Sequence, residues 1–280
     1  MTNKKIYREP LNGQDGFIIS TIHKQTENMR RGLELCKEMY FNRINFCNVN
    51  KNELYDYAIA CEEVAIDGVF HKTELAEEFN YVIEGQCDLE MPDLHRIVVR
   101  DKAFSPEKLR FKIYEGLLCG AKGIEYDSAY DGAITKNDKE DGLFYYIRDI
   151  NQRLEQIGRT LMALKQVATY QPQQWVTESE ILSRQEIPQG CAVSEFMDCE
   201  GHRYLLIQNQ DCIDKSSKVF RFDLKKSFRV YRVNPHNGKQ MITKEKVDTL
   251  NILLMPGDAD VLRFQDADDE AYLIDYVLKK

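Results

Sequence analysis

Apolar residues in the first 170 positions fall into short continuous runs separated by longer stretches with helical spacing. The runs predict five β-strands, at residues 17–21, 43–49, 64–70, 96–101 and 123–127. Helical spacing recurs between most of them, at residues 27–39, 53–61, 73–81 and 105–118. Strands that alternate with helices indicate a parallel sheet with right-handed crossovers, so this part of the chain is expected to be α/β.

A further stretch predicts a long amphipathic helix from Leu143 to Val167. Its apolar positions are three and four residues apart, at 147, 150, 154, 157, 161 and 164. The heptad pattern lasts only about three repeats, which favours a helix packed along a wall of strands over a coiled coil.

The pattern changes after residue 190, where apolar and polar residues alternate along short segments such as Val219 to Leu224. Seven strands are predicted, at 191–198, 203–209, 218–224, 228–233, 250–255, 261–265 and 271–278. Such a series of half-buried antiparallel strands suggests a β-sandwich. We therefore expect an α/β part over residues 1–170, a linker over 171–190 and an all-β part over 191–280.

Composition excludes several classes of protein. The net charge of -8 argues against nucleic-acid binding, which requires clustered Lys and Arg. No apolar run approaches the roughly 20 residues of a membrane span. The polar N-terminus has no apolar stretch behind it, so we expect no signal peptide and a cytoplasmic product. The eight cysteines are scattered singly, which favours free thiols over a disulfide framework.

Motifs for metals and cofactors are missing from the sequence. The five histidines have no H-x-x-x-H spacing, and no D-x-D-x-D-G calcium loop occurs. The glycine patterns of nucleotide-binding loops and the G-x-S-x-G motif of serine hydrolases are also missing. We therefore expect neither a metal nor a cofactor.

The segment from Ser105 to Asp127 carries a family resemblance. Ser105 and Pro106 begin a helix, Gly120 and Gly123 end it, and a short strand follows. With Gly120-Ala121-Lys122-Gly123-Ile124 as its most specific piece, this segment resembles the last βα units of the TIM-barrel glycoside hydrolases, the β-galactosidase-like group. The resemblance covers roughly residues 93–167. It implies the second half of a TIM-type β/α barrel followed by an antiparallel β-sandwich, with carbohydrate as the ligand.

The same resemblance implies a catalytic acid, a Glu after Asn at the end of the fourth barrel strand, and a nucleophilic Glu at the end of the seventh. If residues 123–127 are the eighth strand, residues 96–101 are the seventh and residues 17–21 the fourth. Asp101 then stands in the nucleophile's place, and the fourth strand has no Asn-Glu pair. Hydrolysis of O-glycosyl bonds normally needs two carboxylates. The remaining catalytic candidates are Asp67 and Glu125, at predicted strands whose ends could form a crevice.

Further polar and aromatic residues near the predicted strand ends are candidates for contact with a sugar, because a ring covers the apolar face of a pyranose and carboxylates accept hydroxyl protons. These candidates are Tyr126, Asp127, Tyr130, Asp131, Asn48 and Arg100. The alternative is a solvent loop that ends in the turn Asp131-Gly132. Trp175 is expected to pack in the core or between domains rather than to form a carbohydrate face.

Five strands do not make an eight-stranded barrel. The chain could be a shortened or broken gene product, it could close the barrel by pairing with a second copy, as a homodimer, or with another protein, or the strands could form an open twisted sheet. Two functions follow from these possibilities. One is a glycoside-hydrolase-like protein that is catalytically impaired as this chain alone, and the other is a non-catalytic module that binds carbohydrate or self-associates.

Overall fold

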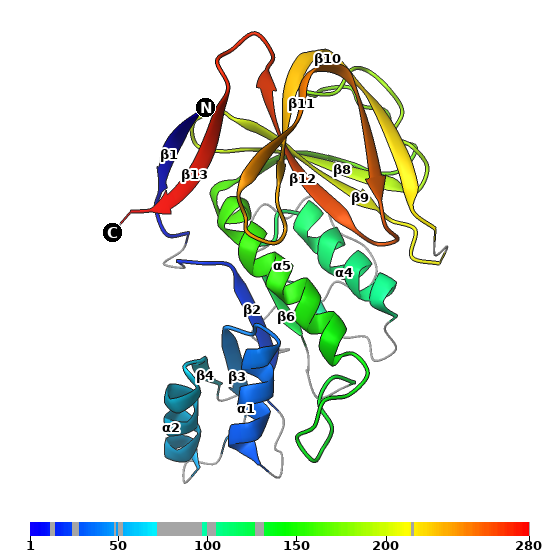
Figure 1. The fold of residues 1–280 in the computed structure, drawn as a ribbon. Helices are drawn as coiled ribbons and strands as arrows, with labels where there is room; N and C mark the ends of the chain where they lie inside the picture. The colour runs from blue at the N-terminus through cyan, green and yellow to red at the C-terminus, as the bar shows by residue number, and fades with distance from the viewer. Residues whose placement is uncertain are drawn as a thin grey trace. The chain divides into compact units, whose positions relative to one another are not determined.

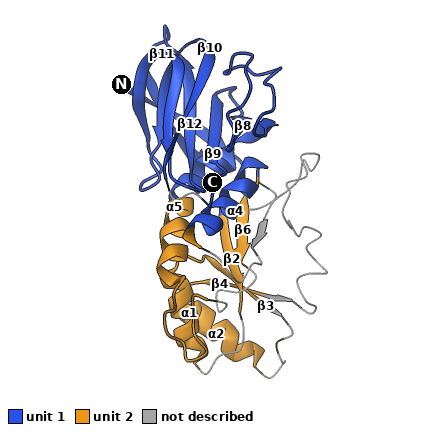
Figure 2. Cartoon of the chain, turned by 90° about the vertical axis from the view of Figure 1, so that its right-hand side faces the viewer, with its two compact units in different colours: residues 1–17, 107–120, 156–280 blue, residues 18–106, 121–155 orange. Residues whose placement is uncertain are grey.

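The computed structural model combines an α/β part with a β-rich part, as expected from the sequence (Figure 1). It describes residues 1–11, 15–23, 28–47, 49, 53–71, 97–99, 105–126, 132–213 and 216–279. The chain forms two compact units, which Figure 2 colours separately. Unit 1 contains residues 1–17, 107–120 and 156–280, and unit 2 contains residues 18–106 and 121–155.

Unit 2 is built on a parallel five-stranded sheet with the order β4-β3-β2-β6-β5. Its strands are β2 (Ile18–Ile22), β3 (Arg43–Cys47), β4 (Asp67–His71), β5 (Ile97–Val99) and β6 (Gly123–Tyr126). Every neighbouring pair is parallel, which confirms the sheet type that the alternating pattern predicts.

The strand order corrects one assignment made from the resemblance. The fourth and eighth strands of an eight-stranded barrel are not neighbours, yet β2 pairs directly with β6, with Ser20 opposite Glu125. Residues 17–21 therefore do not occupy the place of a fourth strand beside an eighth at 123–127. The missing Asn-Glu pair at the end of β2 therefore says nothing about the acid of a fourth barrel strand.

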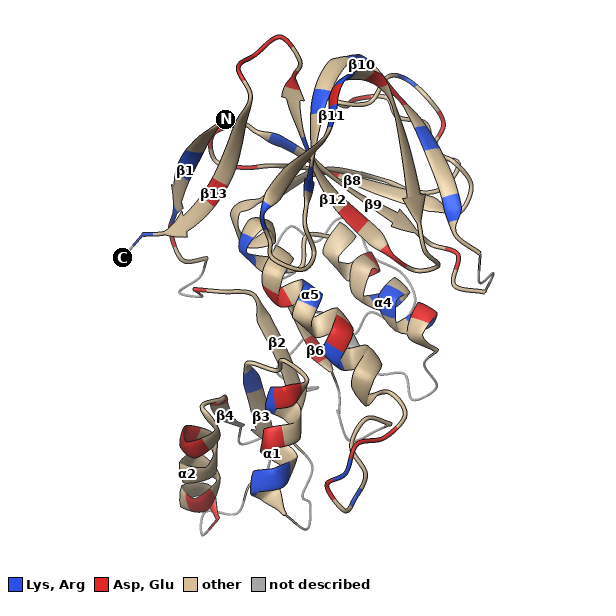
Figure 3. Ribbon diagram, viewed as in Figure 1, with Lys and Arg blue, Asp and Glu red and all other residues tan. Residues whose placement is uncertain are grey.

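Two helices connect the first three strands of this sheet. Helix α1 (Met29–Glu38) begins at Asn28, whose side chain accepts a hydrogen bond from the Arg31 N–H at 3.1 Å. Its basic and acidic residues are interspersed (Figure 3), and Arg30 and Arg31 each form an ion pair with Glu34. Because these pairs are exposed, each contributes only about 0.3–0.5 kcal/mol.

Helix α2 (Leu54–Val64) runs further than the sequence predicted. The helix continues through Val64 and ends where Ala65 adopts a left-handed conformation with φ 57°. The following strand β4 consequently begins at Asp67, whereas the apolar pattern predicted a strand from Val64. The apolar run Val64-Ala65-Ile66 spans the boundary between α2 and β4. Periodicity alone does not distinguish such a boundary from one continuous strand.

Unit 1 contains a six-stranded sheet with the order β11-β10-β12-β9-β8-β7 and antiparallel pairing throughout. Its strands are β7 (Lys165–Tyr170), β8 (Cys191–Met197), β9 (Arg203–Asn209), β10 (Lys218–Val233), β11 (Gln240–Leu254) and β12 (Ala259–Asp266). The predicted strands 218–224 and 228–233 are one strand, β10, which is bent by irregular register near Phe228. The expected alternation is present, since Phe220, Phe222 and Leu224 are buried and the residues between them are exposed.

A second, two-stranded sheet in unit 1 joins the two ends of the chain. Strand β1 (Thr2–Arg8) pairs in parallel with β13 (Tyr272–Leu278) over their full lengths. The sequence analysis assigned residues 1–11 to the α/β part, so the expected boundary at residue 170 is wrong at this end of the chain. It is also wrong at β7, which belongs to the antiparallel sheet although it precedes residue 170.

Two helices complete the described elements, α4 (Pro106–Leu118) and α5 (Phe144–Ala163). Helix α5 confirms the predicted amphipathic helix, but it ends at Ala163, so residues 165–167 belong to β7. Helix α4 packs on the antiparallel sheet of unit 1. The Gln208 amide donates to the carbonyl oxygen of Phe111 at 2.8 Å, and the Ser194 hydroxyl donates to that of Leu118 at 2.7 Å.

The cysteines mostly agree with the expectation of free thiols. Cys36, Cys61, Cys191, Cys199 and Cys212 are free, whereas Cys119 is disulfide-bonded and so departs from the expectation. None of the helices in the described part of the chain combines the length and the apolar character that crossing a membrane requires.

Candidate functional site

A buried carboxylate lies on the parallel sheet of unit 2. Glu125 is the third residue of β6, and its side chain is only 2% exposed. Its Oε2 atom accepts a hydrogen bond from the Asn45 amide at 2.7 Å and from the Ser20 hydroxyl at 3.1 Å. Both donors are themselves buried, at 1% and 0% exposure. We call Ser20, Asn45 and Glu125 the sheet cluster.

The sheet cluster follows from the strand order. Strand β2 lies between β3 and β6, so side chains from three neighbouring strands meet on one face of the sheet. A carboxylate buried without donors would cost several kcal/mol, of the order of 1–3 kcal/mol or more for each unmade charged hydrogen bond. The amide and the hydroxyl supply two such bonds and fix the direction in which the carboxylate points.

His23 lies one residue beyond β2, next to the sheet cluster. Its backbone N–H donates to the carbonyl oxygen of Asn45 at 2.9 Å. The imidazole packs against the rings of Phe46 and Tyr57, with centroid distances of 5.1 and 5.4 Å. Burial in these surroundings lowers the pKa of His23 to about 4, because the charged form loses its hydration. The ring is therefore neutral at pH 7.

The structure places Tyr126 in the packing of unit 2 rather than beside Glu125. Successive strand residues point to opposite faces, so Tyr126 lies on the face of β6 opposite Glu125. Its hydroxyl donates to Asn151 Oδ1 at 2.8 Å, and the Asn151 amide donates to the carbonyl oxygen of Met39 at 2.9 Å. The ring is 4% exposed and meets Phe41 edge-on at 5.2 Å. Tyr126 therefore stabilises the packing between α5 and the sheet.

Asp67 is also misplaced by the sequence prediction. It is the first residue of β4 rather than a residue near its C-terminal end. Its carboxylate forms an ion pair with Arg43 Nε at 2.7 Å, with 53% of the Asp67 side chain exposed. Strands β3 and β2 separate β4 from β6, which places Asp67 about 14 Å from Glu125 along the sheet at about 4.8 Å per strand. The sheet therefore does not bring Asp67 and Glu125 together.

The remaining predicted site residues lie outside the part of the chain that the structure describes. They are Asp101, Asp127, Tyr130, Asp131, Asn48 and Arg100. Their roles stay predictions. Among the described residues, no group of three or more His, Cys, Asp or Glu side chains is arranged to hold a metal ion.

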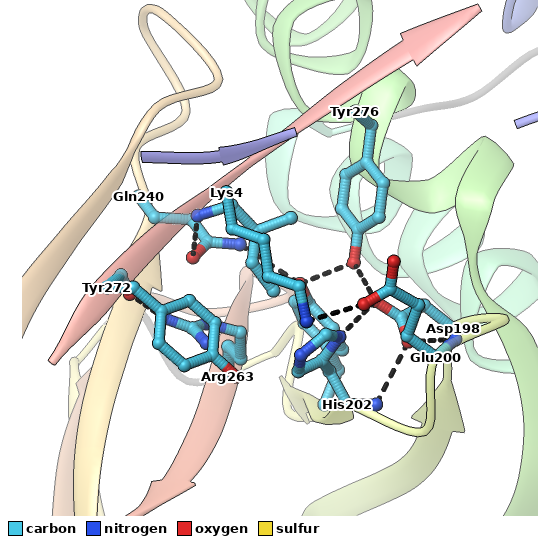
Figure 4. Close-up of polar contacts among 10 residues, drawn as sticks. Lys4, Asp198, Glu200, His202, Gln240, Arg263, Tyr272 and Tyr276 are labelled. Atoms are coloured by element: carbon cyan, nitrogen blue, oxygen red, sulfur yellow. Dashed lines mark hydrogen bonds and ion pairs between the residues drawn. The ribbon is translucent and has the colours of Figure 1, made fainter. Parts of the chain in front are cut away.

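The sequence analysis missed a second polar cluster, which lies in unit 1 around Asp198 (Figure 4). The Asp198 side chain is fully buried and accepts four hydrogen bonds. Two come from the backbone N–H groups of Glu200 and His202, at 2.9 Å each, one from His202 Nδ1 at 2.7 Å and one from the Tyr276 hydroxyl at 2.8 Å. Tyr276 in turn shares a 2.6 Å hydrogen bond with Tyr204.

Electrostatics in this cluster favour an ionised Asp198. Burial alone raises the pKa of Asp198, but hydrogen bonds from His202 and Tyr276 outweigh it and lower the pKa below its usual value. Burial raises the pKa of the Tyr204 and Tyr276 phenols, so both stay protonated at neutral pH. The cluster thus ties β13 to the turn between β8 and β9.

A stack of cations and rings extends this cluster to the N-terminal strand. The Arg263 guanidinium is fully buried and lies 3.8 Å from the ring centroid of Tyr231 and 4.9 Å from that of Tyr272. Lys4 Nζ lies 5.5 Å from the Tyr272 ring and forms a 2.5 Å ion pair with Glu200. The spacing Asp198-x-Glu200-x-His202 was visible in the sequence, but only as a turn. Its partners come from both chain ends, which local patterns do not connect.

Comparisons with known proteins identify no family. No family model matches the chain, and no curated protein matches it. Among the solved structures that resemble it are several glycoside hydrolases, at low similarity. A GH27 β-L-arabinopyranosidase from Geobacillus stearothermophilus is 9% identical over 86% of this chain and 62% of its own, with a TM-score of 0.37. A GH30 endoxylanase from Clostridium papyrosolvens is 7% identical over 95% of this chain and 99% of its own, with a TM-score of 0.35.

A GH30 subfamily 8 xylanase from Clostridium acetobutylicum is 10% identical over 80% of this chain and 65% of its own, with a TM-score of 0.36. The chain spans about three fifths of the length of the first structures that it matches, 61% and 62%.

Proposed function

We propose that this protein is glycoside-hydrolase-like, binds carbohydrate at the parallel sheet, and has no glycosidase turnover as this chain alone. The observation that carries the proposal is the sheet cluster, a carboxylate, an amide and a hydroxyl brought together from three parallel strands. In α/β folds of parallel strands, ligands bind at the C-terminal ends of the strands.

The strand pairing supports a barrel-like origin of the sheet. Three of the four pairs join strands that follow one another in the chain, β2 with β3, β3 with β4, and β5 with β6. The fourth joins β6 to β2, which is the pairing of last strand with first in a closed β/α barrel. We therefore interpret β2 as a first strand and the sheet as part of a barrel with fewer than eight strands. This replaces the interpretation as a second half.

The sheet cluster would form the floor of the proposed site. Asn48, Arg100 and Asp127 directly follow β3, β5 and β6 in the sequence. We propose them as sugar contacts, because their amide, guanidinium and carboxylate groups suit the hydroxyls of a neutral sugar. Tyr130 and Asp131 follow within a few residues, and we retain them as proposed contacts.

Binding is favoured over hydrolysis by the carboxylates of the described residues. Glycosidases place two carboxyl groups about 5–5.5 Å or about 6.5–9.5 Å apart. Glu125 already accepts two hydrogen bonds, and Asp67 begins β4 in an ion pair with Arg43. Glu125 and Asp67 therefore do not form such a catalytic pair with each other.

Two measurements test the proposal. Isothermal titration calorimetry with neutral mono- and oligosaccharides should show saturable binding. The affinity should fall at least about tenfold in Glu125→Gln, because a charged hydrogen-bond acceptor is lost. Asp67→Asn is the matched control, since it removes an exposed carboxylate from the same sheet. Turnover of chromogenic aryl glycosides that vanishes in Asp101→Asn or Glu125→Gln would refute the non-catalytic part, and equal effects of both calorimetry variants would refute the site.

Self-association is a second candidate function, favoured by the outer face of α2. Leu54, Tyr55 and Ile59 are 42%, 73% and 37% exposed on this helix. Burial of such side chains between two copies would contribute about 25 cal/mol per Å² of apolar area. Light scattering should then show a dimer that Tyr55→Lys converts to a monomer, and a monomeric wild-type chain would contradict this candidate.

A further inference from the structure

Trp175 is the only tryptophan of the chain, and it is 55% exposed. The sequence analysis expected this residue to pack in the core or between domains, and the structure contradicts a core position. Tryptophan is highly buried on average, because water contact with its large apolar ring is unfavourable. A ring held in solvent on an ordered segment is therefore a candidate for binding.

The backbone around Trp175 holds the ring on a rigid support. Trp175 and Glu186 form an antiparallel bridge. Its two flanking hydrogen bonds join the Ile187 N–H to the Gln174 carbonyl oxygen at 2.9 Å and the Val176 N–H to that of Gln185 at 2.8 Å. In such a non-hydrogen-bonded pair the two side chains lie close together, with Cα atoms about 4.5 Å apart. The side chains of Trp175 and Glu186 therefore start from neighbouring positions on the same side of the bridge.

The two sides of this segment differ in polarity. Val176 and Ile187, each next to a member of the bridge, are 1% exposed and belong to the hydrophobic core of unit 1. Trp175 and Glu186 are exposed, and so are Thr177 and Arg184, two residues further along each side of the bridge. Core packing thus anchors Val176 and Ile187, while Trp175, Glu186, Thr177 and Arg184 remain exposed to solvent.

We propose that Trp175 and Glu186 form a glycan-binding platform on the β-rich unit, separate from the sheet cluster. The indole ring covers the apolar C–H face of a pyranose, and the Glu186 carboxylate accepts hydrogen bonds from its hydroxyl groups. Thr177 and Arg184 can reach the next sugar unit of a chain. The ligand class rests on the proposed function, whereas the platform rests on the exposed ring and its polar neighbours.

The surroundings of the ring favour a glycan over a protein partner. Binding hot spots in protein interfaces are aromatic residues enclosed by further contacts that exclude water. Around Trp175 the exposed neighbours along the bridge are polar or charged, which suits a hydroxyl-rich ligand with one apolar face. Burial of the ring by a protein would also desolvate Glu186 and Arg184, which costs free energy unless both find partners.

The single tryptophan makes the platform directly observable. Intrinsic fluorescence of the full chain should shift to shorter wavelength and saturate on titration with at least one of soluble xylan, mixed-linkage β-glucan or galactan. The same polysaccharides cast into native gels should retard the wild-type chain. Trp175→Ala should lose at least about tenfold in affinity by gel retardation, Trp175→Phe should retain part of it, and Glu186→Gln should weaken it.

Matched variants separate this site from the sheet cluster and from a general surface effect. Tyr7, which is 56% exposed, provides the control Tyr7→Ala, and this variant should bind like the wild type. Glu125→Gln should leave the fluorescence shift unchanged if the platform acts alone. Absence of any shift and of any retardation with all three polysaccharides, or equal losses in Trp175→Ala and Tyr7→Ala, would overturn the proposal. If calorimetry then shows carbohydrate binding that only Glu125→Gln weakens, the carbohydrate binds at the sheet cluster and not at Trp175.

Discussion

Replacement of Gly257 by Ala should destabilise the protein strongly, because the turn that contains Gly257 packs against helix α4. Gly257 has φ +70°, a conformation that costs a residue with a Cβ about 1–2 kcal/mol. An added Cβ would lie 2.3 Å from the carbonyl oxygen of Glu107 and 2.9 Å from the backbone nitrogen of Phe111. These are backbone atoms that cannot rotate away, so overpacking adds about 1–3 kcal/mol. The expected loss of stability is about 2–5 kcal/mol.

Gly201 provides the matched control, because it has φ +89° but nothing within 4 Å of an added Cβ. Gly201→Ala should therefore lose only the conformational share, about 1–2 kcal/mol. Urea unfolding followed by circular dichroism gives both values, and their difference measures the contact between the turn and α4. Equal losses in the two variants would refute the reasoning, since they would show that the turn does not rest on the helix.

Two further predictions concern the buried polar groups. Asp198→Asn should cost about 2–4 kcal/mol in urea unfolding, because charge-assisted hydrogen bonds from His202 and Tyr276 are weakened. Since the folded pKa of Asp198 is lowered, its stabilisation is present above the unfolded value of about 3.9 and is lost as the pH falls below it. Wild type and Asp198→Asn should thus converge in stability in acid, and a constant difference down to acidic pH would contradict this account. Tyr126→Phe should lower the free energy of unfolding by about 1 kcal/mol, because the hydrogen bond to Asn151 is lost. Sugar binding measured by calorimetry should not change. Weakened binding would show that Tyr126 contacts the sugar after all.

Local patterns predicted most elements and the chemistry of one site residue. The spacing of apolar residues predicted helices α1, α2, α4 and α5, because an amphipathic stripe must match the helical period wherever the helix packs. Glu125 was predicted as a catalytic candidate, and it lies in the sheet cluster.

Errors in the site prediction arose where side-chain direction depends on exact strand limits. Asp67 was placed in mid-strand because the apolar end of α2 continued into β4 without a polar break. Tyr126 follows Glu125 directly, and both cannot face the same side of one strand. Trp175 was expected to be buried because of its size, but only its neighbours Val176 and Ile187 are buried.

The sequence by itself determined most of the helices and strands and the parallel type of the first sheet, because these depend on residues close together in the chain. Only the tertiary structure decided that β6 lies beside β2, that the N-terminal strand pairs with β13, and that Lys4 reaches the turn holding Asp198. Each of these contacts joins residues that are far apart in the sequence. Hydrophobic periodicity shows that a face will be buried but does not specify its partner, and the choice of partner follows from the packing of the whole chain.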